Sequence, residues 1–154
     1  MASFRGKYDY QLDAKGRVSI PAKFRKALTP EAEDTFIIVC APGGSLRAYP
    51  KDVWETYESR LAALPETPKN NWIKTVMFAI QIESTLDVQG RVLLSPELMK
   101  RAGITKEVVL VGMLSYVGLW DKAKYDEYLA SDGNTTDSKF DEVFYEVMAG
   151  LAGQ

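Results

Sequence analysis

Short stretches in which apolar and polar residues alternate recur along the chain, and this period of two is typical of half-buried β-strands. Val18 and Ile20 mark one such stretch, and Val92 and Leu94 mark a second. Each is followed by two apolar runs of strand length. We therefore expect further strand pairs at residues 36–40 with 46–49 and at residues 108–111 with 117–119.

Apolar residues at the spacing of one helix face predict three longer helices, at residues 53–64, 72–80 and 140–151. A shorter helix follows each alternating stretch, and it is clearest in the second, where Ser95 is a suitable N-cap and Gly103 a suitable end. The last long helix is acidic on its outer face. The sequence leaves open whether its apolar face packs on its own chain or on a neighbouring subunit.

A repeated motif indicates that the chain contains two similar halves. Residues 12–21 (LDAKGRVSIP) recur as residues 86–95 (LDVQGRVLLS), with Leu, Asp, Gly, Arg and Val identical in both copies. Downstream, residues 49–57 parallel residues 120–128. One such motif could belong to any hairpin turn, but two copies followed by matching patterns indicate a duplication. Halves this small bury only a thin core alone, so we expect them to pack against each other.

The boundaries between these parts follow from the same patterns. The predicted fold is of the α+β class, and four segments are expected: a first half at residues 1–66, a bridging helix at 67–81, a second half at 82–130 and a C-terminal amphipathic helix at 131–154.

Each copy of the motif predicts a tight turn. Gly16 and Gly90 lie where the turn needs a positive φ, which glycine adopts at little cost. Asp13 and Asp87 can accept hydrogen bonds from N–H groups within the turn. The arginine after each glycine presents a planar fork that matches O6 and N7 of guanine. It could instead pair with the aspartate and only stabilise the hairpin, and the residues alone leave both interpretations open.

Charge is distributed unevenly along the chain. The formal net charge is −2, yet residues 1–28 hold seven basic and two acidic residues, whereas residues 121–154 hold three basic and eight acidic residues. A local basic patch matters more for phosphate binding than the total charge. The alternative, that these runs are simply solvated faces, also stays open.

The composition excludes several kinds of site. The chain has no histidine and one cysteine, so Ser-His and Cys-His nucleophiles and imidazole zinc sites are excluded. Cys40 follows three apolar residues and is expected to be a small buried hydrophobe. We therefore expect no enzyme, no cofactor, no metal and no small-molecule ligand.

No apolar run approaches the ~20 residues of a membrane span, and the N-terminus lacks the apolar stretch of a signal peptide. A cytoplasmic protein without membrane contact is expected.

The same residues resemble the MraZ family, whose halves belong to the swapped-hairpin class shared with AbrB-like regulators and several antitoxins. The resemblance spans nearly the whole chain and rests on residues 4–6 (FRG), 12–21, 90–96 (GRVLLSP), 102–112 (AGITKEVVLVG) and 119–121 (LWD). It implies two tandem β-barrel halves with flanking helices, whose interlocking β-hairpins form a shared small barrel and make one chain a pseudo-dimer. It also implies homo-oligomers that form closed rings. It also implies a nucleoid-associated regulator that binds double-stranded promoter DNA at short direct repeats near cell-division and cell-wall genes.

Carried over to this chain, the resemblance implies DNA contacts by Lys15 and Arg17 in the first motif and by Arg91 in the second. Asp13, Gly16, Asp87 and Gly90 would shape the turns. Among the other basic residues near the N-terminus, the further candidates for DNA contact are Arg5, Lys23 and Arg25. The last two follow the hairpin on a helix, so phosphate or water is their expected partner.

This chain departs from the family at several positions. Gln89 replaces the lysine of the first motif, Met99 stands where many relatives have arginine, and the bridging helix carries only Lys69 and Lys74. These differences predict unequal DNA binding by the two halves. The alternative function is an antitoxin-like interaction module that regulates its own operon, in which one segment would wrap a toxin.

Overall fold

The fold is described from a computed structural model of residues 3–130 and 136–152. These residues form two compact units, one ending at Lys122 and one beginning at Ala123, and each is described by itself. The first half of the chain contains β1 (Phe4–Gln11), β2 (Arg17–Ser19), α1 (Ala22–Lys26), β3 (Thr35–Ala41), β4 (Ser45–Pro50) and α2 (Lys51–Ala62), with 3-10 turns at Pro30–Ala32 and Pro42–Gly44. The second half repeats this order with β5 (Ile82–Thr85), β6 (Arg91–Leu93), α4 (Pro96–Ala102), β7 (Glu107–Leu114), β8 (Val117–Asp121) and α5 (Lys122–Leu129). The bridging helix is α3 (Pro68–Ile80), and the last described helix is α6 (Thr136–Ala152).

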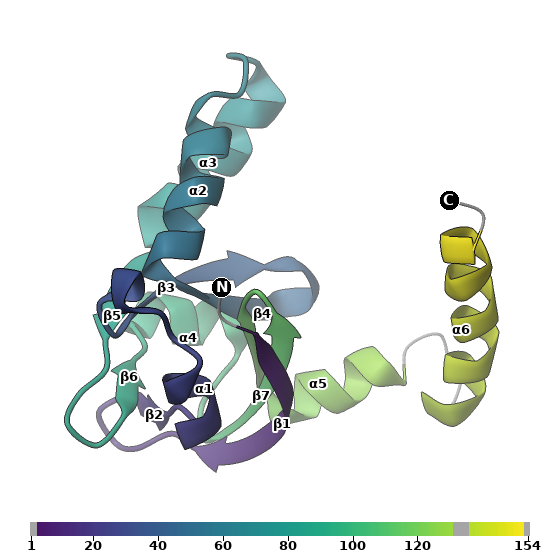
Figure 1. Cartoon of the computed structure of the whole chain (residues 1–154), viewed down its shortest axis with the longest axis horizontal. Coiled ribbons are helices and arrows are strands. Elements are labelled where there is room, and N and C mark those ends of the chain that lie inside the picture. The colour runs from purple at the N-terminus through teal and green to yellow at the C-terminus, as the bar shows by residue number, and fades with distance from the viewer. Residues whose placement is uncertain (1–2, 131–135, 153–154) are drawn as a thin grey trace. The chain divides into compact units, whose positions relative to one another are not determined.

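Six strands form one antiparallel sheet in the order β1-β7-β8-β4-β3-β5 (Figure 1). By their positions in the two halves, β1 is equivalent to β5, β3 to β7 and β4 to β8. Equivalent strands therefore follow one another in the same order from either edge of the sheet. β1 pairs with β7 of the second half, with Phe4 opposite Leu114, and β5 pairs with β3 of the first half, with Thr35 opposite Thr85. Each half therefore lends its first strand to the hairpin of the other. The α+β class and the pseudo-dimer that the resemblance implied are confirmed.

A second, two-stranded sheet lies at the centre of this pseudosymmetry. β2 and β6 are antiparallel, and the equivalent residues Val18 and Val92 lie opposite each other. Both valines are fully buried. This pairing brings the two copies of the repeated motif together, because each motif leads directly into one of these strands.

The main core draws its side chains from both halves. Phe4 is fully buried, and its ring lies 5.4 Å from that of Phe24 and 6.1 Å from that of Phe36. Leu98 and Leu110, from the second half, belong to the same buried cluster. The prediction that the halves pack against each other is therefore confirmed. The predicted burial of Cys40 is also confirmed.

The ends of the helices follow their local sequence. The Ser95 hydroxyl accepts a hydrogen bond from the Leu98 N–H at 3.2 Å, and Gly103 ends α4 with a φ of 65°, as predicted. The start of α3 is capped by Thr67, which was not predicted as an N-cap. The Thr67 hydroxyl accepts from the Asn70 N–H at 3.1 Å, and proline follows it at the first helical position.

Two of the helices project together from the first compact unit. α2 and α3 extend away from β2 and β6 (Figure 1), and Gln81, just after α3, donates a hydrogen bond to Glu58 of α2 at 3.2 Å. Within residues 3–130 and 136–152, no helix combines the length and apolar character needed to cross a membrane.

The second compact unit presents an apolar cleft of about 420 Å³, which is lined by Tyr128, Leu129, Lys139, Phe140, Val143, Phe144, Val147 and Met148. The predicted C-terminal helix is thus found as α6, while residues 131–135 and 153–154 of that prediction lie outside the described residues.

Candidate nucleic-acid interface

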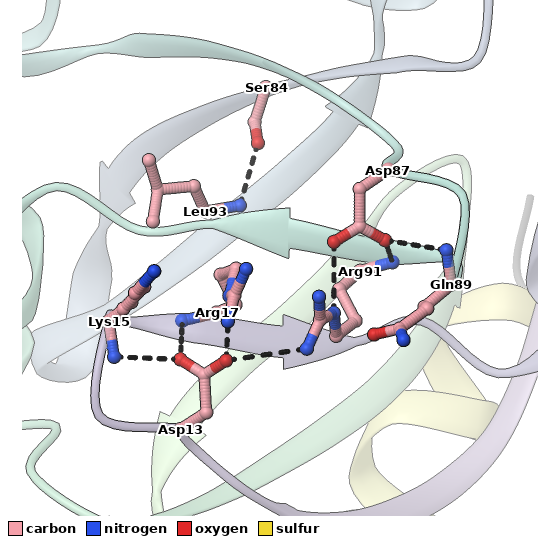
Figure 2. A network of polar contacts seen from close by, with 8 residues as sticks. All are labelled: Asp13, Lys15, Arg17, Ser84, Asp87, Gln89, Arg91 and Leu93. Carbon is pink, nitrogen blue, oxygen red and sulfur yellow. Dashed lines mark hydrogen bonds and ion pairs between the residues drawn. The ribbon is translucent and has the colours of Figure 1, made fainter.

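The two repeated turns lie at opposite ends of the antiparallel pair of β2 and β6, each directly before its own strand (Figure 2). Gly16 has a φ of +82° and Gly90 a φ of +75°, so both positions require the left-handed conformation that the sequence predicts. The backbone of each turn also forms a hydrogen bond with the residue that follows the strand of the other half. The Leu94 N–H donates to the Gly16 carbonyl at 2.8 Å, and the Ile20 N–H donates to the Gly90 carbonyl at 2.9 Å.

The first turn is organised around one carboxylate. The backbone N–H groups of Lys15 and Arg17 each donate to Oδ1 of Asp13 at 2.9 Å. The Arg17 side chain donates from Nε to Oδ2 of the same residue at 2.7 Å. Asp13 therefore fixes both the backbone of the turn and the direction of the arginine.

The second turn repeats this arrangement. Oδ1 of Asp87 accepts from the N–H groups of Gln89 and Arg91 at 2.9 Å, and Oδ2 accepts from Nε of Arg91 at 2.9 Å. One contact breaks the symmetry, since Nη1 of Arg91 also reaches Oδ2 of Asp13 at 3.5 Å (Figure 2). No sequence pattern predicts this contact between the halves.

The two arginines consequently differ in how far their guanidinium groups are engaged. Arg91 contacts both carboxylates and its side chain is 23% exposed. Within residues 3–130 and 136–152, Arg17 pairs only with the carboxylate of Asp13, and its side chain is 33% exposed. Among the described residues, no hydrogen bond reaches Nη1 or Nη2 of Arg17. The Asp–Arg pairs that would stabilise the hairpin are thus present in both turns. They hold Nε and leave the outer edge of Arg17 available to a further acceptor.

Hydrogen bonds and charge stabilise the ionised form of both aspartates. The N–H of Arg17 is the main cause that lowers the pKa of Asp13 to about 2, with further contributions from the Arg17 side chain and the Lys15 N–H. The pKa of Asp87 is also lowered, mainly by the N–H of Arg91. Both carboxylates are therefore charged at neutral pH, and the paired turns keep a fixed set of ion pairs.

This arrangement predicts a loss of stability in acid. Asp13 has an ordinary pKa of 3.8 and a native pKa of about 2, so its stabilising contribution is fully present above pH ~4 and is lost as the pH falls towards 2. The variant Asp13→Asn should melt at a lower temperature than the wild type at pH 7. Its melting temperature should also fall less between pH 4 and pH 2. Thermal unfolding at a series of pH values measures both, and an unchanged pH dependence would contradict the role assigned to Asp13.

The other candidate residues lie at different places in the fold. Lys15 is exposed within the first turn, and Lys23 and Arg25 are exposed on α1, directly after β2. Arg5 lies at the start of β1, opposite Met113, at the other end of that strand from the turn. The structure therefore does not bring Arg5 to the paired turns, and its contact with DNA stays a prediction.

Each turn is also covered by a side chain from the helix of the other half, and no sequence pattern predicts this contact. Met99 of α4 lies against Gly16, and Arg25 of α1 lies against Gly90. The pairing of β2 with β6 explains both contacts, because it places the end of each strand, just before its helix, beside the turn of the other half. Within the described part of the chain, no three metal-binding side chains come together.

The exchanged strands and paired Asp-x-x-Gly-Arg turns define a protein of the swapped-hairpin class. A family model for the MraZ protein, described as antitoxin-like, matches residues 3–72 and also residues 77–143. The chain is 36% identical to the Transcriptional regulator MraZ of Acidovorax sp. (strain JS42), over 92% of this chain and 96% of the relative. It is 40% identical to the protein of the same name from Burkholderia cenocepacia, over 80% of this chain and 85% of the relative. The chain belongs to the MraZ family.

Proposed function

We propose that this protein is a sequence-specific DNA-binding transcriptional regulator that acts on short direct repeats in a promoter of cell-division and cell-wall genes. The observation that carries the proposal is the pair of Asp-x-x-Gly-Arg turns joined by β2 and β6, in which each arginine is oriented by a carboxylate. The relatives are named as transcriptional regulators, which favours this function over an enzymatic one. The cytoplasm and the nucleoid are the locations that such a protein requires.

Arg17 is the leading candidate for a base contact. Its Nε is held by Asp13 at 2.7 Å, so its guanidinium group has a fixed direction before DNA arrives. The outer edge of that group can donate two hydrogen bonds to O6 and N7 of guanine in the major groove. Arg91 is the weaker candidate because Nη1 is already in contact with Asp13.

Phosphate contacts would come from the exposed basic residues around these turns. Lys15 within the first turn and Lys23 and Arg25 on α1 are exposed at neighbouring positions of the chain. Phosphate contacts position a protein on the duplex without reading its sequence. Because the net charge of one chain is −2, several copies on repeated sites would have to supply the affinity together.

The direct test is binding to DNA upstream of the protein's own gene, compared with random DNA of equal length under excess non-specific competitor. We expect a stable shift on promoter DNA only. The affinity should fall steeply with salt, with a slope of roughly −0.9 per phosphate contact in a plot of log affinity against log salt concentration. Equal binding to both DNAs would refute sequence-specific regulation.

Assembly into a homo-oligomer, in the form of a closed ring, is the second part of the proposal. Several large apolar side chains are exposed in the single chain, among them Trp72 on α3 at 64% and Phe140 on α6 at 61%. Apolar faces of this kind mark interaction surfaces, and a closed ring satisfies every interface between identical subunits. Light scattering at micromolar concentration should therefore give a mass well above the 17.2 kDa of one chain. A monomer at that concentration would contradict the ring and remove the source of avidity.

An antitoxin-like function is the alternative, and the description of the family favours it. In that case a small partner protein would cover the apolar cleft between Tyr128 and Met148 of the second compact unit. Co-expression with the protein encoded by the adjacent gene tests this alternative. A stable stoichiometric complex that blocks the partner's toxicity would support it, and free chains without a complex would exclude it.

A further inference from the structure

Arg25 lies over the second turn, although it belongs to the first half. A Cβ atom placed on Gly90 would lie only 2.7 Å from Cζ, Nε and Nη1 of Arg25, so the guanidinium group rests directly against the glycine backbone. At the equivalent place on the first turn, a Cβ on Gly16 would lie 3.3 Å from Cε of Met99. The helix of each half therefore covers the turn of the other half.

Two hydrogen bonds connect Arg25 to this turn. Its Nε donates to the carbonyl of Ile20 at 3.1 Å, and the N–H of Ile20 donates to the carbonyl of Gly90 at 2.9 Å. The side chain is nevertheless exposed. Among residues 3–130 and 136–152, no acidic side chain forms an ion pair with it and no hydrogen bond reaches its Nη nitrogens. Arg25 is thus held at one edge of its guanidinium group and presents the other edge to solvent.

The two halves carry their basic residues in a complementary pattern. Lys15 of the first motif corresponds to Gln89 of the second, and Arg25 of the first half corresponds to Met99 of the second. Because the helices cross over, the first turn combines Lys15 with Met99, while the second combines Gln89 with Arg25. Together with its own arginine, each turn then has two basic side chains beside one aspartate. The positive charge that is missing from the second motif is supplied by the helix of the other half.

We propose that Arg25 is a phosphate-binding residue of the second turn, where it performs the role that Lys15 has at the first turn. This inference rests on the proposed DNA-binding function. A guanidinium group that is anchored through Nε can still donate two hydrogen bonds to a phosphate oxygen pair. The two turns therefore bind the DNA backbone with similar charge, despite the glutamine of the second motif.

A comparison of single and double variants tests this assignment on the promoter fragment over a series of salt concentrations. Arg25→Met should weaken binding and reduce the salt slope by about 0.9 for each engaged copy. The variant Gln89→Lys returns a positive charge to the same turn. Adding Gln89→Lys to Arg25→Met should therefore raise the affinity for DNA more than adding it to the wild type. The matched control is Lys26→Met, which removes an exposed charge from the same helix. In that background, Gln89→Lys should give the same gain as in the wild type.

Three outcomes overturn the inference. Arg25→Met could leave affinity and salt slope unchanged, or Gln89→Lys could give equal gains in the wild type and with Arg25→Met. A lower melting temperature with an unchanged salt slope would show that Arg25 only braces the turn. In each case the wild type still prefers promoter DNA, so the proposed function stands. If the wild type shows no preference for promoter over random DNA, the proposed function and this inference fail together.

Discussion

Arg17→Ala should abolish most of the discrimination between promoter and random DNA while it changes the fold little. The loss of specific binding is expected to be ~1–3 kcal/mol for each engaged subunit, compounded over the subunits of one assembly. The physical reason is the geometry of the first turn, where Asp13 holds Nε of Arg17 at 2.7 Å and leaves its outer nitrogens available for a base. Competition mobility shifts with the two DNAs measure the effect.

Lys23→Ala is the matched control for this prediction. Lys23 is exposed on α1, and a phosphate contact there carries no sequence information. Its loss should weaken specific and non-specific binding about equally and reduce the salt slope. If Arg17→Ala instead lowers the melting temperature and keeps full discrimination, Arg17 only stabilises the hairpin through Asp13, and base reading by this residue is wrong.

Phe4→Ala should have the largest effect on stability. Phe4 is fully buried, contacts the rings of Phe24 and Phe36, and anchors β1 to β7 of the other half. Truncation of such a side chain typically lowers the free energy of unfolding by about 3–5 kcal/mol. This is a large part of the ~5–15 kcal/mol that stabilises an ordinary domain. Urea unfolding followed by circular dichroism, at one fixed protein concentration, measures the loss.

The neighbouring exposed residue supplies the comparison. Arg5→Ala changes the same strand outside the core, so its effect should stay within about 0.5 kcal/mol of the wild type. Equal stability of Phe4→Ala and Arg5→Ala would show that the exchanged strand does not carry the shared core.

Local patterns predicted the elements and the turns well, because their causes are local. The positive φ of Gly16 and Gly90 and the N-cap at Ser95 depend on residues only a few positions away. The strand predicted at residues 36–40 is found within Thr35–Ala41 because this apolar run is long enough to be recognised as a buried strand.

Contacts between the halves could not be predicted in the same way. Alternation assigns a residue to a face of a strand and does not identify the strand beside it. The family resemblance implied interlocking hairpins in general, and the pairing of β1 with β7 is seen only in the structure. The contacts of Arg25 with Gly90 and of Arg91 with Asp13 depend on the pairing of β2 with β6, and the charge of one motif alone therefore understates the charge around the second turn.

The most direct test of the central claim locates the DNA on the protein. Val88 is fully exposed in the second turn, and Ala14 is exposed at the equivalent place in the first. The photo-crosslinking residue p-benzoylphenylalanine, introduced at either position, should form crosslinks with promoter DNA at bases within the repeats. The same residue at the exposed Ala63, at the end of α2, should form none, because α2 extends away from the turns (Figure 1). Crosslinks from Ala63 without crosslinks from Ala14 and Val88 would contradict the claim that the paired turns bind DNA.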